Sequence, residues 1–475
     1  MEMSSNFDLS RLLAGQATLD TRQKLKFVCK LSVPGILAQI SSIVMQYIDA
    51  AMVGKLGADA SASIGLVASS TWVLGSLCNS ISTGFTVQVA QAVGAGKQLL
   101  AKTVLQKSIK FCLIFSFSLA AIAMSVSGFL PAWLGSDGSI RRDASLYFLI
   151  YSASVPFYQL IYLMGGMLQC SGNMRTPSIL NSLMCVMDVG FNALFIGGLG
   201  MGVLGAALGS AVSVVIVALL MLWSAVHKSE YLGLTKGRSP KKDSLDLEER
   251  NSINRRAVKL ASPIAVQSVA FTGALVVVTK LIAPLGSVSL SANSFAVTAE
   301  ALCYMPGYGI SDAATTLVGQ SVGAKRKDLA DSFSWITVIS GMAIMLLTGI
   351  LMYAICPVVF RLLTPVPEIR ELSIKILRIE LFAEPLYGAS IVATGALRGK
   401  NDTLVPSILN LISLWIVRLG LSFLLVKNLS LVGIWIAMAI ELCFRGLVML
   451  VRLLVKTKKS TKNGIDKINP NRDIY

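Results

Sequence analysis

The sequence has few ionisable side chains and almost no histidine. Charged residues make up 14% of its 475 residues, against about 25% in an average soluble domain, and His227 is the only histidine. A histidine proton relay and most histidine-ligated metal centres are therefore excluded. The eight cysteines are scattered and none forms a Cys-x-x-Cys pair, so their spacing predicts neither a zinc site nor a disulfide framework. We expect a protein that is not an enzyme and has no cofactor.

Acidic residues are scarce relative to basic ones, with 25 Asp and Glu against 42 Lys and Arg and a formal net charge of +17. In a soluble chain this excess would suggest nucleic-acid binding, but the chain is 54% apolar with a mean hydropathy of +0.69. The runs Phe111–Phe129 and Val212–Val226 carry no charge, as in helices that cross a hydrocarbon core of about 30 Å. The pattern predicts an all-α integral membrane protein in a lipid bilayer, with no nucleic-acid partner. Continuous apolar runs exclude a β-barrel.

Segments of the first half recur in the second half at a constant spacing. Gln91–Ala95 returns as Gln320–Ala324, and Pro177–Asn181 returns as Pro406–Asn410, each 229 residues later. Four further pairs share this spacing: Pro34 and Pro263, Gly57 and Gly286, Pro156 and Pro385, Tyr158 and Tyr387. The chain is therefore a tandem duplication, which in an apolar protein is typical of transporters.

Polar breaks divide each copy into six spans, which predicts twelve transmembrane helices. Their limits are 31–54, 61–93, 103–129, 144–169, 177–199, 203–226, 258–284, 289–321, 331–359, 372–397, 403–426 and 430–453. An even number per copy gives both copies the same orientation, so the two six-helix repeats are parallel. The predicted units are an N-terminal segment at 1–30, a first bundle at 31–226, a linker at 227–257, a second bundle at 258–455 and a basic tail at 456–475.

Lysine and arginine cluster in the loops on one side of the predicted helices. That side includes Lys97, Lys102, Lys325 and Arg326, together with the linker and the tail. The other side offers little beyond Lys55, Arg141, Arg142 and Lys427, with the 359–378 connection as its one basic exception. The positive-inside bias predicts a multi-pass protein of the cell membrane with both termini in the cytoplasm.

Four polar residues of the first half fall inside the predicted membrane: Asp49, Asp188, Asn192 and Ser210. A carboxylate at mid-membrane costs on the order of 3 kcal/mol, so it needs an explanation. Helical rise puts Asp49, Asn192 and Ser210 about 9–12 Å below the outer surface, with Asp188 one turn deeper. Such a set suits a cation-coupling site, either for sodium held by Asp49, Asp188 and Asn192 or for a proton. The alternative is that the acids only hydrogen-bond to neighbouring helices.

The second half does not repeat this set, because the positions equivalent to Asp49, Asp188 and Asn192 are Val278, Val417 and Leu421. It has its own acids near the midplane, Glu300 and Glu384. Glu384 precedes Pro385, which favours a helix bend beside a buried acid. We expect Glu300, Glu384 and Tyr387 to bind substrate. The alternative for Glu384 is a structural pair with Arg418.

Several motifs together resemble the MATE (multidrug and toxic compound extrusion) transporters. They are Pro34, Ile48-Asp49, Val53–Gly57, Gly202–Ala207, Val318–Ala324 and Gly395–Gly399. The resemblance implies two six-helix bundles facing a central cleft, and export of small molecules by cation antiport. It also implies that Asp49, Asp188, Asn192 and Ser210 match the family's first-bundle cation site. The order Asp188 then Asn192 departs from the family's usual helix-5 pair, and helix 7 lacks the carboxylate of one branch.

The sequence thus predicts an antiporter, expected to act as a monomer, that exchanges sodium or a proton for amphiphilic, cationic organic compounds. Its near rival is a lipid-linked oligosaccharide flippase, whose anionic substrate would need a cavity lined with Arg and Lys. The interior offers only Arg418 and Lys280 for that purpose. A membrane-embedded enzyme would need a catalytic set that is missing, and a channel would need a ring of pore-lining polar residues.

Overall fold

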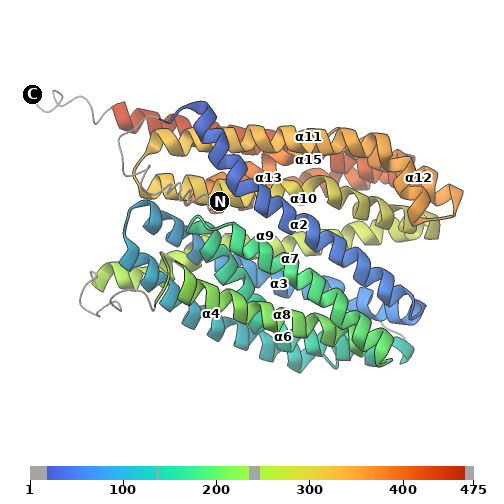
Figure 1. Cartoon of the computed structure of the whole chain (residues 1–475). Helices are drawn as coiled ribbons and strands as arrows, with labels where there is room; N and C mark the ends of the chain where they lie inside the picture. Colours follow the sequence, from blue (N-terminus) through green and yellow to red (C-terminus); the bar gives the residue numbers. More distant parts are fainter. Residues whose placement is uncertain (1–18, 136–137, 230, 235–246, 466–475) are drawn as a thin grey trace, which may run out of the picture.

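The computed structural model describes residues 19–135, 138–229, 231–234 and 247–465, and within them every regular element is a helix. The helices lie roughly side by side, so that the chain forms two groups stacked against each other (Figure 1). Exposed apolar side chains such as Ile114 and Phe117 on one group and Leu347 on the other provide the surface that meets lipid.

Six membrane-crossing helices form the first half. The elements are α2 (Thr21–Gly54), α3 (Ala58–Gly94), α4 (Gln98–Val126), the short α5 (Leu130–Trp133), α6 (Gly138–Cys170), α7 (Arg175–Asn192) with its π-helical extension η1 (Ala193–Gly198), and α8 (Gly202–Trp223) with its extension η2 (Ser224–Lys228). Gly57, between α2 and α3, has a φ of 112°, which favours glycine. Its equivalent Gly286 has a φ of 95° at the same place in the second half.

The second half repeats this order with more interruptions. Its elements are α9 (Leu247–Ile282) with η3 (Ala283–Leu285), α10 (Ser287–Gly323), α11 (Lys327–Leu363), α12 (Pro367–Glu380), α13 (Glu384–Gly399), α14 (Leu404–Ile412) with η4 (Ser413–Arg418), and α15 (Leu419–Ile465). The bend predicted beside Glu384 is confirmed, because α12 ends at Glu380 and α13 begins at Glu384 with Pro385 in its first turn.

The helices account for the predicted spans and confirm the fold class. Nine helical segments of the described chain are long and apolar enough to cross a membrane. The last of them, 404–458, holds two spans, because the backbone breaks at Ser430 with φ 52° and ψ −135°. The 37-residue α10, with Glu300 and Asp312 in its interior, and the α12–α13 pair complete six spans per half.

Corresponding helices of the two halves start at the same end of the molecule, as a parallel repeat requires. Lys24 at the start of α2 donates to Ser332 at the start of α11 over 3.0 Å. Gln88 near the end of α3 donates to the carbonyl of Ile253 near the start of α9 over 3.2 Å. We call this the basic end: α2, α4, α9 and α11 begin there and α3, α6 and α10 end there.

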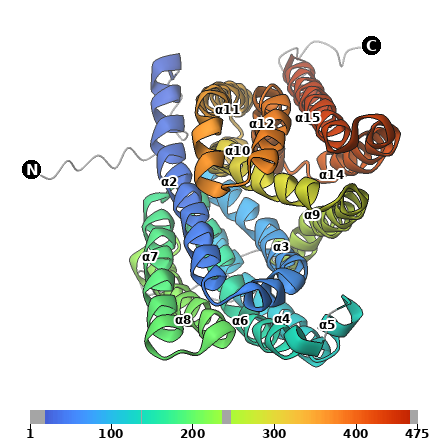
Figure 2. The same ribbon diagram turned by 90° about the vertical axis from the view of Figure 1, so that its right-hand side faces the viewer.

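The halves contact each other through α3 against α10 and through two further helix pairs that are equivalent to each other. α2 packs along α10, and α3 packs along α9, which places α2 and α9 at the junction between the groups (Figure 2). At the basic end the contact is closest between the repeated motifs. A Cβ on Gly94 would lie 1.9 Å from the carbonyl oxygen of Gln320, and one on Gly323 would lie 2.0 Å from that of Gln91.

The two glutamine side chains repeat the symmetry. Gln91 Nε2 donates to the carbonyl of Gly399 over 3.1 Å, and Gln320 Nε2 donates to that of Cys170 over 2.9 Å. Each acceptor ends the equivalent helix of its half, and the two are again 229 residues apart. The glutamine of the repeated motif therefore forms the same hydrogen bond across the interface in both copies.

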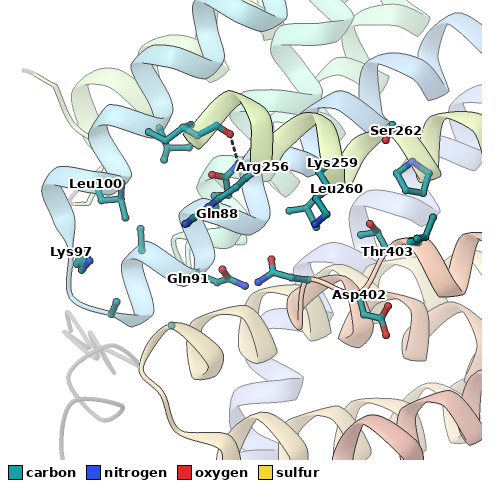
Figure 3. A pocket seen from close by; sticks show the side chains of 18 of the residues that line it. Gln88, Gln91, Lys97, Leu100, Arg256, Lys259, Leu260, Ser262, Asp402 and Thr403 are labelled. Carbon is teal, nitrogen blue, oxygen red and sulfur yellow. Dashed lines mark hydrogen bonds between the residues drawn. The ribbon is translucent and has the colours of Figure 1, made fainter. Parts of the chain in front are cut away.

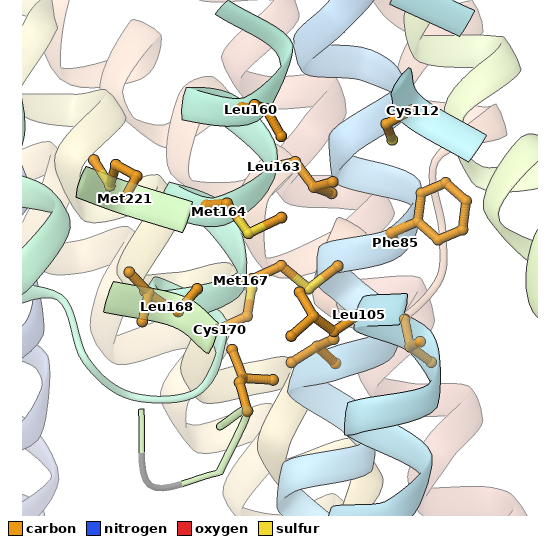
Figure 4. Packing of buried hydrophobic residues seen from close by; sticks show 14 of the residues in the cluster. Phe85, Leu105, Cys112, Leu160, Leu163, Met164, Met167, Leu168, Cys170 and Met221 are labelled. Atoms are coloured by element: carbon orange, nitrogen blue, oxygen red, sulfur yellow. The ribbon is translucent and has the colours of Figure 1, made fainter. Parts of the chain in front are cut away.

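The first half is held together by a packed core between α3, α4, α6 and α8. Fully buried side chains from these helices interdigitate there, including Phe85, Leu105, Leu163, Met164 and Met221 (Figure 4). Dense packing of this kind leaves the core of the first half little room to rearrange.

The predicted terminal and linker segments lie partly outside the described residues, namely at 1–18, 235–246 and 466–475. Where they are described they are largely helical: α2 begins at Thr21, α9 at Leu247, and α15 continues to Ile465. Leu232 of the predicted linker is buried in the core of the first half.

Candidate functional site

The predicted polar residues of the first half meet near the end of the molecule opposite the basic end. Asn192 Nδ2 donates to Asp49 Oδ1 over 3.0 Å and to Asp188 Oδ2 over 3.2 Å. Ser210 of α8 lies close enough to Asp188 to interact with it electrostatically. We call Asp49, Asp188, Asn192 and Ser210 the first-half polar cluster. It joins α2, α7 and α8, as helical rise predicted.

Local sequence explains why the three helices come this close. Asp188 and Asn192 are one turn apart on the same face of α7, and α7 changes to π-helical geometry directly after Asn192, as often happens at functional sites. Across from Asn192 stands Gly209 of α8, where a Cβ would lie 2.1 Å from Asn192 Oδ1. Any larger residue at 209 would displace the Asn192 side chain from the cluster.

The cluster is buried and short of positive charge. Asp188 and Asn192 are each 2% exposed, and Asp49 is partly buried. Within the described part of the chain, no lysine or arginine is ion-paired with either carboxylate. Two carboxylates that share one amide and lack a counter-charge are costly in a dry interior. Uptake of one monovalent cation or proton removes part of that cost.

The residues fit sodium in ligand type. Carboxylate and amide oxygens are the ligands that hard cations prefer, and Asn192 Oδ1 accepts no hydrogen bond in the described structure. Here, however, the amide presents its Nδ2 to both carboxylates. A sodium ion held by Asp49 and Asp188 would require the amide to rotate and present Oδ1, whereas a proton on one carboxylate would leave the amide in place.

A face of tyrosines on α6 lies next to the cluster and was missed from the sequence. Tyr147, Tyr151 and Tyr158, with Ser210 of α8 among the other lining residues, surround a cavity of ≈ 10 Å³, about the room of one water molecule. The rings of Tyr151 and Tyr158 are 5.0 Å apart. Spacings of four and seven residues place these tyrosines on one helix face, and this signal could have found them.

The predicted substrate residues of the second half are buried at the junction of α10, α12 and α13. Glu300 is 3% exposed, Glu384 is fully buried and Tyr387 is 9% exposed. The Tyr387 ring packs against Tyr304 at 5.5 Å between centroids, and the Arg445 guanidinium lies 5.2 Å from its centre. These residues line neither of the two cavities described in this structure.

A third acid, Glu380, belongs to the same group and was not singled out from the sequence. It is fully buried at the end of α12 and interacts electrostatically with Glu300 and Glu384. We call Glu300, Glu380 and Glu384 the second-half acid cluster. The spacing of Glu380 and Glu384, one helical turn, was the available signal.

Two arginines stand near the second-half acid cluster. Both Arg418 and Arg445 interact electrostatically with Glu300, but the ion pair of Arg445 is with Glu441 at 3.0 Å. An Arg418–Glu384 ion pair, the alternative considered from the sequence, is not among the ion pairs of the described residues. Instead Arg418 Nη2 lies 2.9 Å from the sulfur of Met438.

One hydrogen bond joins the helices that carry the two clusters. The Tyr47 hydroxyl on α2 donates to the carbonyl of Thr298 on α10 over 2.7 Å. Tyr47 is two residues from Asp49, and Thr298 is two residues from Glu300. A movement of α2 at Asp49 would therefore be transmitted through this hydrogen bond to α10, the helix that bears Glu300.

Comparison with known proteins gives a match to one family over most of the chain. The family model MatE matches residues 34–194 and again 263–424. The two matches begin 229 residues apart, which is the spacing of the internal repeat.

Curated relatives share about a quarter of their residues with the chain over nearly its whole length. A probable multidrug resistance protein NorM from Thermotoga maritima is 26% identical over 90% of this chain and 92% of its own length. The multidrug and toxin extrusion protein 2 of Mus musculus is 24% identical over 93% of this chain and 76% of its own length.

Solved structures have the same fold at lower identity. An outward-facing multidrug resistance MATE family transporter of the MOP superfamily superposes with a TM-score of 0.86, covering 95% of this chain and 98% of that one at 18% identity. The same values hold for a MOP superfamily transporter from Pyrococcus furiosus, described as having a binding pocket of reverse polarity that suggests a different function. The same fold therefore occurs in a transporter for which a different function is suggested.

Proposed function

The chain belongs to the MatE family of membrane transporters, and from this membership and its buried polar clusters we propose that it is a cation-coupled antiporter that exports drug-like organic compounds. It is a transporter rather than an enzyme. The observation that supports the coupling most is the first-half polar cluster, in which two carboxylates share one amide donor without an ion-paired cation.

The coupling step follows from that contact. Asn192 holds α2 to α7 through Asp49. A sodium ion that binds Asp49 and Asp188 competes with the amide for the carboxylate oxygens, whereas a proton on one carboxylate leaves the amide in place and weakens its hydrogen bond by removing the charge. Binding thereby changes how firmly α2 is held to the first half. Because α2 is also bonded to α10 through Tyr47 and Thr298, the cation biases the contact between the halves. A cation drives transport only if it binds the two arrangements with different affinity.

The second-half acid cluster favours positively charged substrates. Its three carboxylates outnumber the nearby Arg418 and Arg445, and the Tyr387 and Tyr304 rings supply aromatic surface of the kind that binds organic cations. These groups are buried in the present arrangement, so substrate reaches them only after the halves separate. We propose Glu300, Glu384 and Tyr387 as substrate-binding residues and add Glu380 to them.

The orientation proposed from charge puts the basic end in the cytoplasm. Lys97, Lys325 and the starts of α2 and α9 all lie at that end. The protein would then sit in the cell membrane as a monomer, with both termini inside, with its basic end closed in this structure and with the first-half polar cluster near the outer side.

An alternative substrate class is a lipid-linked oligosaccharide. The fold permits it, since a structurally similar transporter is described with a pocket of reverse polarity. The excess of acids over arginines in the second-half acid cluster is the feature that favours an organic cation instead.

The proposal is tested by reconstituting the full-length protein into proteoliposomes loaded with ethidium. Efflux is recorded with a sodium gradient alone, with a pH gradient alone and with both collapsed. We expect one gradient to drive efflux, and Asp49→Asn to slow it at least about tenfold, the scale of a coupling energy of 1–3 kcal/mol. The matched control is Asp59→Asn, which removes an exposed acid just beyond the end of α2 and should change little.

Two results would contradict the proposal. Efflux at the same rate with every gradient collapsed would exclude cation coupling. Full activity of Asp49→Asn would remove the first-half polar cluster from the mechanism. A fluorescent anionic lipid, flipped while ethidium stays inside, would favour the flippase.

A further inference from the structure

A large cavity lies at the basic end, away from both polar clusters. Its volume is ≈ 740 Å³, and residues of both sequence copies line it. The first copy contributes Gln88 and Gln91 of α3 and Leu100 of α4. The second contributes the start of α9, the end of α10 and the 401–404 turn between α13 and α14 (Figure 3). We call it the basic cavity.

Four basic side chains line this cavity: Lys97, Arg256, Lys259 and Lys325. Arg256, Lys259 and Lys325 are exposed, and within the described residues no carboxylate is ion-paired with any of the three. One acid, Asp402, also lines the cavity, but it is already held by Arg452 at 2.7 Å and by Lys456 at 3.6 Å. Among the described residues, the lining therefore carries a net positive charge.

The wall carries both charged and apolar side chains. On α9 it changes from basic at Arg256 and Lys259 to apolar at Leu260 and Pro263, and the apolar Ile253 lies one turn before Arg256. Leu404 of the second half and Val104 of α4 add further apolar side chains. An anionic head with a hydrocarbon chain matches such a wall, and basic pockets between transmembrane helices are known to take phospholipid headgroups.

We propose that the basic cavity is a binding site for a phosphate-bearing anion, in its membrane setting the headgroup of an anionic phospholipid. Arg256 offers a planar fork of donors suited to phosphate oxygens, and Lys259, one turn further along α9, adds a second charge. The contacts of Gly94 with Gln320 and of Gly323 with Gln91, which we call the Gln–Gly contacts, lie next to the cavity. Because both copies line the cavity there, the bound anion bridges the halves. It stabilises the arrangement that is closed at the basic end, since it binds that arrangement better than one in which the cavity walls have separated.

The test compares two double variants of the full-length protein, each of which replaces two basic side chains by glutamine. Arg256→Gln with Lys259→Gln removes two charges that line the cavity. Arg255→Gln with Lys327→Gln is the matched control, because it removes two exposed charges from the same end of the molecule outside the lining. All four positions are exposed, so we expect both variants to fold, and a thermal melt in detergent checks this.

Lipid retention is measured by native mass spectrometry after extraction from vesicles of equal parts phosphatidylcholine and phosphatidylglycerol. Each basic residue contributes about 1 kcal/mol to the binding free energy of an anionic lipid. We therefore expect the cavity variant to retain phosphatidylglycerol about thirtyfold more weakly than wild type, and the control to stay near wild type. A second arm titrates inorganic phosphate into protein in neutral detergent and follows its melting temperature. Stabilisation lost in the cavity variant alone would assign the site to a soluble phosphate.

The proposal is overturned if both double variants retain phosphatidylglycerol equally and respond equally to inorganic phosphate. As a further check, Arg256→Glu places a negative charge in the lining. It should abolish retention of phosphatidylglycerol, and retention at the wild-type level would also reject the site. Both readouts are binding measurements, so they stand or fall independently of ethidium transport.

Discussion

Replacing Gly94 by alanine should open the basic end of the molecule. The added Cβ would lie 1.9 Å from the carbonyl oxygen of Gln320, and that neighbour is backbone, which cannot turn aside as a side chain can. α3 and α10 must then move apart by about 1 Å or more to reach ordinary contact. Overpacking of this kind costs about 1–3 kcal/mol, and 2 kcal/mol corresponds to about a thirtyfold shift in population from the closed to the open arrangement.

The matched control for this change is Gly65→Ala on the same helix. No atom lies within 4 Å of the Cβ that alanine would add there, so the substitution should be neutral or should stabilise α3 by up to about 1 kcal/mol. Any difference between the variants then reports the contact with α10 rather than helix propensity.

The assay is a distance measurement by electron paramagnetic resonance in proteoliposomes. Spin labels are attached to cysteines that replace Lys110 on α4 of the first half and Lys327 at the start of α11 in the second, both exposed. The background has the exposed Cys29 replaced by serine. We expect Gly94→Ala to lengthen the label distance and Gly65→Ala to leave it unchanged. The same distance distribution in both variants would refute the closing role of the Gln–Gly contacts.

Two further substitutions probe the path from the cation to the contact between the halves. In Gly209→Ala the new Cβ would lie 2.1 Å from Asn192 Oδ1 and should displace that side chain, which lowers gradient-driven efflux at least about tenfold. The control Gly190→Ala adds a Cβ into open space and should transport normally. Equal efflux rates of the two variants would contradict the reasoning. Tyr47→Phe removes the bond to the Thr298 carbonyl, worth about 1 kcal/mol. It should reduce ethidium efflux per coupling cation about fivefold without changing cation affinity, measured by isothermal titration, and a loss of affinity instead would place Tyr47 in the cation site.

Much of the architecture could be predicted because it depends on local properties of the chain. Hydropathy gave the spans, the constant spacing gave the duplication, and an even number of spans gave the parallel repeat. Helical rise alone placed Asp49 and Asn192 at a common depth, and the structure brings them to 3.0 Å. Depth is a one-dimensional quantity that sequence spacing determines directly.

What could not be predicted depends on how helices rotate and pair. Glu380 was overlooked because its spacing from Glu384 links it to that acid but does not say which face of α12 turns toward Glu300. The pairing of α2 with α10 was not foreseen because it rests on close backbone contacts such as Gly35 against Gly309, and one glycine among many does not identify its partner. The roles of the first-half polar cluster and of the second-half acids stay predictions until transport is measured.

The doubled Gln–Gly contact also restricts how the two copies can diverge. The first copy has Asp49, Asp188 and Asn192 where the second has Val278, Val417 and Leu421, so the two copies differ at positions inside their helices. Gly94 and Gly323 cannot differ in this way, because each presses on the backbone of the opposite copy and a larger side chain at either would disturb both. Because these contacts lie where the two copies meet, the two halves can diverge in sequence and in function only at positions away from that meeting point.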